Sequence, residues 1–245
     1  MKKSLILSSM FIVAALVSQT AQAGVKLRAG VASSTYTLGG DYGDAVSDYT
    51  PITLGGAYAV DNGMYFDLSY TGGTGEHDGY APTYPKEDFK RSDVTLAFGR
   101  AHVNESNGMA FGYYAGLKSG TTTLGAQNVW YVPWYEETFT SSGLILGGGV
   151  SFPIASGRGG SVGVNLGVGL MGTTWKDDAG WNKTSDTAVG TSFGVNYNYQ
   201  FNSTVGVTVD YKAHNYKYIF DLVGNPEFAI EEKISALGAT VNVSF

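Results

Sequence analysis

The sequence predicts an all-β fold: a single closed, antiparallel, up-and-down β-barrel of about ten strands. Two observations lead to this prediction. Segments in which apolar and polar residues alternate with period two recur throughout residues 24–245, and the connections between them alternate between short and long. No convincing 3.6-residue periodicity, as expected of an amphipathic helix, accompanies them. The same pattern leaves eight or twelve strands open as alternatives to ten.

Residues 1–23 have the pattern of a secretory signal peptide. Two lysines at positions 2 and 3 precede an apolar stretch over Leu5–Val17, and Ala21-Gln22-Ala23 forms a small-x-small cleavage site. The alternative is an uncleaved anchor helix, which the short apolar run disfavours. We therefore expect a barrel domain over residues 24–245.

The clearest alternation lies at residues 161–171, where five aliphatic residues alternate with Ser, Asn and Gly. Residues 189–201 alternate almost as regularly. All ten predicted strands carry one apolar face, and they lie at about 25–31, 52–60, 65–70, 93–98, 111–118, 144–152, 161–171, 189–201, 205–212 and 236–245.

The connections give the barrel two different ends. Short turns are predicted at 61–63, 104–108, 153–160 and 202–203, and long loops at 33–48, 72–88, 119–138, 173–186 and 213–230. Short periplasmic turns and long extracellular loops are typical of bacterial outer-membrane barrels. The even number of strands places both termini on the short-turn side.

A soluble barrel of the lipocalin or avidin kind would turn its apolar face inward, whereas a membrane barrel turns it towards lipid. The face opposite the apolar one is rich in Gly, Ser, Thr and Asn, and is too poor in Lys and Glu to be the whole surface of a soluble protein. It is therefore predicted to line a lumen. Its charged residues are Lys26, Arg28, Asp67, Arg91, Asp93, Lys118, Asp210 and Lys212.

Aromatic residues recur on the apolar face near the short turns, as expected for a girdle at the membrane boundary. This set comprises Tyr58, Phe66, Phe98, Phe111, Phe152, Phe201 and Phe245.

Phe245 ends the given sequence after a run of alternating apolar residues. In this feature, together with the signal peptide and the meander, the chain resembles Gram-negative outer-membrane barrel proteins, and within them the small OmpA-like or opacity-type barrels. The resemblance implies outer-membrane localisation and contact with membrane lipid and lipopolysaccharide. It also implies recognition of Phe245 by the barrel-assembly machinery.

Composition excludes several functions. The chain has no cysteine, so disulfides and Cys-based metal sites are excluded. The formal net charge is −6, or −8 once the two lysines of the signal peptide are removed, which disfavours nucleic-acid binding. No cofactor is expected.

No catalytic site is expected either. The three histidines, His77, His102 and His214, do not fall at one end of the predicted barrel, and Glu76-His77-Asp78 is better explained as a solvated loop. Ten strands is also the size of the omptin surface proteases, but their paired Asp–His and Asp–Asp residues have no counterpart around Asp210 and His214. The His-x-Ser motif of lipid A deacylases is absent as well.

The best functional candidate is a set of aromatic residues predicted on neighbouring long loops, with a strand extension or an outer aromatic belt as the alternative. It comprises Trp130, Tyr131, Trp134, Tyr135, Trp175 and Trp181. We expect a structural or surface-interaction barrel whose lumen is plugged by large inward residues: Tyr65, Tyr114, Arg28 and Arg91. The alternative is a narrow porin-like channel for ions or small solutes, and a hydrolase at the rim is the third hypothesis.

Overall fold

The computed structural model describes residues 24–40, 43–77, 87–125, 136–154, 160–177, 180, 182–222 and 225–245. Residues 1–23 lie outside these ranges, so the signal peptide stays a prediction. Within the described ranges, no helix is long and apolar enough to cross a membrane.

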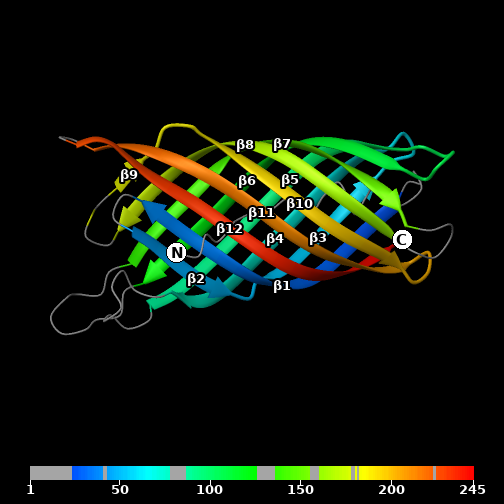
Figure 1. Cartoon of the computed structure of the whole chain (residues 1–245), viewed down its shortest axis with the longest axis horizontal. Coiled ribbons are helices and arrows are strands. Elements are labelled where there is room, and N and C mark those ends of the chain that lie inside the picture. Colours follow the sequence, from blue (N-terminus) through cyan, green and yellow to red (C-terminus); the bar gives the residue numbers. More distant parts are fainter. Residues whose placement is uncertain are drawn as a thin grey trace.

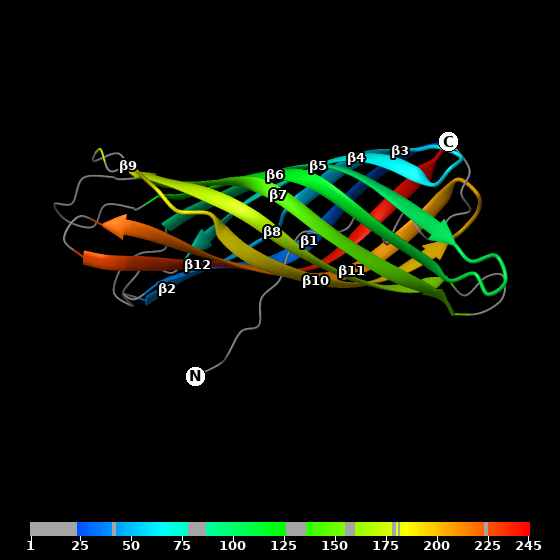
Figure 2. The same cartoon turned by 90° about the horizontal axis from the view of Figure 1, so that it is seen from above.

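The described chain consists of antiparallel strands that wind obliquely around a cylinder (Figures 1 and 2). The strands are β1 (Gly24–Gly40), β2 (Gly43–Tyr49), β3 (Ile52–Ala59), β4 (Met64–His77), β5 (Glu87–Val103), β6 (Ala110–Gly125), β7 (Glu136–Pro153), β8 (Ser161–Asp177), β9 (Asn182–Thr184), β10 (Ala188–Gln200), β11 (Val205–Leu222) and β12 (Asn225–Ser244).

Two pairs of these strands each share one position in the wall. β2 and β3 both pair with β1 and β4, and only Thr50 and Pro51 separate them. Proline has no N–H to donate to a strand ladder, which explains the break. β9 and β10 both pair with β8. Because β1 also pairs with β12, the wall closes with ten strand positions, and the predicted ten-strand barrel is confirmed.

The apolar residues of the alternating segments point out of the barrel and form a surface that we call the apolar belt. Leu166 and Leu237 are 61% and 59% exposed, whereas their neighbours Asn165 and Ala236 are 2% and 7% exposed. A soluble barrel would bury the leucines and expose the asparagine. The observed arrangement suits a wall that faces lipid and encloses a polar lumen.

All seven residues predicted for the aromatic girdle lie on the outer surface, between 41% and 74% exposed. Aromatic rings favour the boundary between acyl chains and headgroups. Their position therefore marks the end of the apolar belt on the side of the short turns.

Paired strand extends into every interval predicted as a long loop. The interval 33–48 lies within β1 and β2 apart from residues 41–42, and 213–230 lies within β11 and β12 apart from residues 223–224. The boundaries predicted for these loops are wrong. Continued pairing satisfies further backbone N–H and C=O groups, so strands have no reason to stop at the membrane surface.

The alternation reverses where the strands leave the apolar belt. On β1 the outward residues are apolar up to Val31, but beyond it Tyr36 and Leu38 point inward and are buried. On β11, Tyr216 and Tyr218 likewise point inward and are buried. Beyond the membrane the outer face meets water, so apolar side chains are more stable inside. The interior is thus mainly polar within the belt, and buried aromatic side chains join the polar ones beyond it.

Candidate functional site in the lumen

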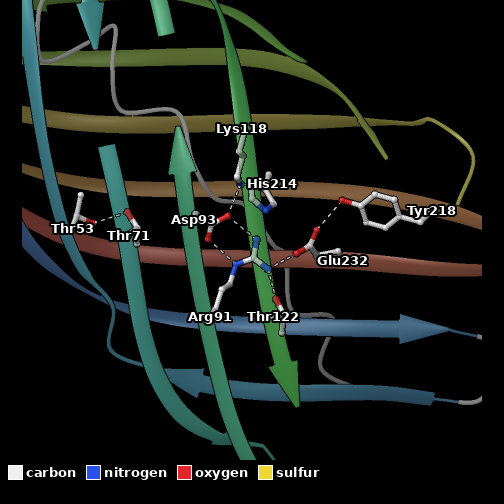
Figure 3. Close-up of polar contacts among 9 residues, drawn as sticks. All are labelled: Thr53, Thr71, Arg91, Asp93, Lys118, Thr122, His214, Tyr218 and Glu232. Atoms are coloured by element: carbon white, nitrogen blue, oxygen red, sulfur yellow. Dashed lines mark hydrogen bonds and ion pairs between the residues drawn. The ribbon is translucent and has the colours of Figure 1, made fainter. Parts of the chain in front are cut away.

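Arg91 on β5 lies at the centre of a charged cluster inside the barrel (Figure 3). Its Nε and Nη2 atoms donate hydrogen bonds to the two carboxylate oxygens of Asp93, at 2.8 and 2.9 Å. Its Nη1 atom donates to Oγ1 of Thr122 on β6, at 2.6 Å, and to Oε1 of Glu232 on β12. An unpaired buried charge would be strongly destabilising, and these contacts satisfy the guanidinium.

Lys118 on β6 extends the cluster towards β11. Its Nζ atom lies 3.2 Å from Oδ1 of Asp93 and 3.5 Å from Nδ1 of His214. Lys118 and His214 are both buried. Asp93 therefore bridges two cationic side chains from neighbouring strands.

Glu232 is held from its other side by Tyr218 on β11, whose hydroxyl donates to Oε2 at 2.9 Å. The guanidinium carbon of Arg91 also lies 5.1 Å from the ring centroid of Tyr36, a cation–π contact. We call the set Tyr218, Glu232, Arg91, Asp93, Lys118 and His214 the lumen cluster.

The lumen cluster joins parts of the wall that are far apart around the barrel. β5 and β12 are separated by β4, the shared β2–β3 position and β1, and β6 and β11 by β7, β8 and the shared β9–β10 position. Side chains can meet across this distance because a barrel of this strand number has a narrow lumen. Figure 3 shows Arg91 and Lys118 meeting Glu232 and His214 from the facing strands. The cluster spans the lumen from wall to wall.

Gly120 on β6 provides the room that the lumen cluster needs. A Cβ atom at this position would lie 2.6 Å from Oδ1 of Asp93 and 3.1 Å from Nη2 of Arg91. Any larger residue would have to displace an ion pair that is already fixed on several sides.

A second buried ion pair lies within the belt. Arg28 on β1 makes a two-point contact with the carboxylate of Asp67 on β4. Only β3 separates these strands, so the pair follows the wall instead of crossing the lumen. The Arg28 side chain passes over Gly55 of β3, where a Cβ atom would lie 2.7 Å from Nε.

The structure places all eight charged residues predicted for the lumen on the inner face. Asp93 and Lys212 are partly buried, and the other six are buried: Lys26, Arg28, Asp67, Arg91, Lys118 and Asp210. Within this set, Arg28 pairs with Asp67, and both Arg91 and Lys118 pair with Asp93.

Sequence reasoning missed three members of the lumen cluster, Tyr218, Glu232 and His214. Two of them fell in an interval predicted as a loop. A signal was nevertheless present, because His214, Tyr216 and Tyr218 continue the inward parity of β11 beyond the apolar belt.

Four aromatic residues meet over the lumen cluster, and we call them the aromatic cap. Trp175 on β8 stacks on Phe139 of β7 and on Phe228 of β12, with ring centroids 5.3 and 6.1 Å apart, and Phe220 of β11 approaches it edge-on at 6.1 Å. The predicted placement of Trp175 in a long loop is wrong, and the alternative of an extended strand holds. β8 continues to Asp177, and the strand parity turns the indole inward.

The other five residues of the predicted aromatic surface lie outside the described residues: Trp130, Tyr131, Trp134, Tyr135 and Trp181. Their role as an interaction surface stays a prediction.

Phe245 lies where the barrel closes. Its N–H donates to the carbonyl oxygen of Val25 at 2.9 Å, and the N–H of Val25 donates back to the carbonyl oxygen of Phe245 at 3.3 Å. Its ring is exposed in the girdle. Recognition of Phe245 by assembly machinery stays a prediction.

Among the described residues, no group of three or more His, Cys, Asp or Glu side chains could hold a metal ion. His102 stacks on Phe111, with centroids 5.0 Å apart, whereas His214 belongs to the lumen cluster. Asp78 of the candidate acidic cluster lies outside the described residues.

No protein-family model matches the chain, and no curated protein matches it by sequence. Among solved structures, the outer membrane protease OmpT of Escherichia coli shares its fold with a TM-score of 0.64 at 12% identity, over 93% of this chain and 100% of that one. The translocator domain of the autotransporter NalP from Neisseria meningitidis has a TM-score of 0.53 at 9% identity, over 91% and 88% of the two chains.

These likenesses concern the fold alone. Combined with the lipid-facing belt, the girdle and the polar lumen, they define the class: the chain is a transmembrane β-barrel of the bacterial outer membrane.

Proposed function

We propose that this barrel has a structural or surface-interaction role and that side chains plug its lumen. The observation that carries the proposal is the lumen cluster, in which Arg91 meets Glu232 across the barrel. A water-filled pore at this level would require separating buried, hydrogen-bonded charges, each of which would lose its partner.

The aromatic cap supports the same proposal. Trp175 contacts rings from β7, β11 and β12, so aromatic side chains from four strands pack together beyond the lumen cluster. A solute would have to pass both obstacles.

The finer assignment to the OmpA-like or opacity-type barrels belongs to this proposal. What supports it is the architecture of a small barrel with a polar, filled interior, although ten strand positions exceed the usual eight of that class.

We also propose that the chain catalyses no reaction. OmpT is a protease, but its likeness to this chain is one of fold. Asp210 and His214 are both buried on the inner face of β11, and His214 lies against Lys118 and Tyr216. A general base needs access to substrate, which this position does not offer.

Planar-bilayer recording of the purified barrel tests the closed lumen. We expect no stepwise conductance from the wild type. The variant Arg91→Ser/Glu232→Ser/Trp175→Ala removes the central ion pair and the cap together, and we expect it to conduct.

The matched control is Arg28→Ser/Asp67→Ser/Trp175→Ala, which removes an ion pair that lies along the wall; we expect it to stay silent. Stepwise conductance from the wild type would support the porin-like alternative instead. If Arg91→Ser/Glu232→Ser/Trp175→Ala migrates as a folded barrel but does not conduct, these three residues do not close the lumen.

A further inference from the structure

Outward-facing hydroxyl groups form an in-register row across five neighbouring strand positions, just beyond the apolar belt. Each residue lies directly opposite the next in the order Ser92, Thr121, Thr140, Thr174 and Thr184. Neighbouring strands lie about 4.8 Å apart, so the wall presents a hydroxyl group at roughly that interval.

A second row follows one step further from the belt. Thr123 and Thr138 lie opposite each other, with Lys90 opposite Thr123 and Lys176 opposite Thr138. The two lysines are exposed and three strand spacings apart, or about 14 Å. We call the two rows together the hydroxyl face.

The hydroxyl face is hollowed where β7 meets β8. A cavity of about 480 Å³ opens there, and its lining combines hydroxyls, one ammonium group and two carboxylates: Glu136, Thr138, Thr140, Thr174, Lys176 and Asp177. This volume is within the range of small-ligand sites.

The hydroxyl face is continuous with the lipid-facing surface. Leu144 and Leu170 are the last exposed apolar residues of β7 and β8, and Thr140 and Thr174 come four residues beyond them. With a rise of about 3.3 Å per residue and a tilt of about 40°, the hydroxyls lie roughly 10 Å beyond the leucines. They therefore face the headgroup layer of the outer leaflet.

We propose that the hydroxyl face binds the phosphorylated sugar headgroup of lipopolysaccharide, with the β7–β8 hollow as its centre. Threonine hydroxyls can donate to and accept from sugar hydroxyls. Lys176 supplies the charge-assisted contact that a phosphate requires, and the carboxylates of Glu136 and Asp177 suit divalent cations that bridge phosphates.

The part of the wall that follows the hydroxyl face lacks this arrangement. β11, two strand positions from β8, presents the exposed residues Asn215 and Lys217, which have the same spacing along the strand as Thr174 and Lys176. Glu231 and Lys233 of β12, beside β11, pair with each other. Asn215 and Lys217 provide a matched control.

The experiment measures binding of purified lipopolysaccharide, with Mg²⁺ present, to the whole barrel in nanodiscs of phosphatidylethanolamine and phosphatidylglycerol. Thr174→Val/Lys176→Gln keeps the shape and strand preference of the first residue and removes one hydroxyl and one charge. We expect its affinity to fall roughly tenfold, as for the loss of one neutral and one charge-assisted contact.

The control Asn215→Val/Lys217→Gln should bind within about twofold of wild type, since neither residue lines the β7–β8 hollow and an exposed charge contributes little. Equal losses in both variants, or no loss in the first, would overturn the proposal. Conductance is independent of this readout, so failure here is distinguishable from failure of the closed-lumen proposal.

Discussion

Arg91 and Glu232 form a buried ion pair across the lumen although 141 positions separate them in the sequence. One side chain comes from β5 and the other from the last strand. The pair can therefore form only after β12 has closed against β1, so it reports directly on the finished barrel.

Arg91→Met should lower the free energy of unfolding by about 3–5 kcal/mol, because it leaves Glu232 buried without its cation. Arg91→Met/Glu232→Met removes both charges and should recover much of that loss. Urea unfolding in lipid vesicles measures the two changes. A double variant less stable than the single one would contradict the assigned pairing.

Gly120→Ala should destabilise the barrel, by roughly 1–3 kcal/mol, because its methyl group would overlap the carboxylate of Asp93. Gly172→Ala is the matched control: nothing lies within 4 Å of a Cβ atom there, and alanine removes backbone freedom from the unfolded chain. The temperature at which the folded gel band is replaced by the unfolded one should fall only for Gly120→Ala. Equal behaviour of the two variants would show that Gly120 is not needed for packing.

Leu166→Arg should be more damaging than Asn165→Arg, although the residues are neighbours. Leu166 faces lipid, where an arginine near the bilayer midplane costs about 2–4 kcal/mol. Asn165 faces the polar lumen, where a charge can be solvated or paired. The measurement is the resistance of the unboiled variants to SDS, which should be lower for Leu166→Arg than for Asn165→Arg. The reverse result would mean that the lipid-facing and lumen-facing sides are assigned wrongly.

Deletion of Phe245 should lower the amount of protein that reaches the outer membrane and raise periplasmic degradation. The deletion removes the hydrogen bonds to Val25 at the seam together with one ring of the girdle. Phe201→Ala is the control, because it removes another girdle ring without touching the seam. Membrane fractionation measures the outer-membrane yield of the two variants. Comparable yields would mean that Phe245 contributes only as a ring of the girdle.

The barrel, a strand number of about ten and the lipid-facing side were predictable from the sequence. Alternation such as that at residues 161–171 and 189–201 already implied a lipid-facing barrel, because every backbone polar group must be paired in hydrocarbon and each strand then needs one apolar side. The strand lengths were not predictable in the same way. Beyond the belt the apolar residues change sides, as at Tyr36 and Tyr218, so a search for one continuous apolar face ends too early.

Eight of the charges that face the lumen could be identified from the sequence, because parity along a strand is a local property. Which charges meet follows from the tertiary structure. Arg91 reaches Glu232 across the lumen, whereas Arg28 pairs with Asp67 along the wall. This difference depends on how the ten strand positions are staggered when the sheet closes. The stagger is a property of the whole wall, and the residues around Arg91 carry no local record of it.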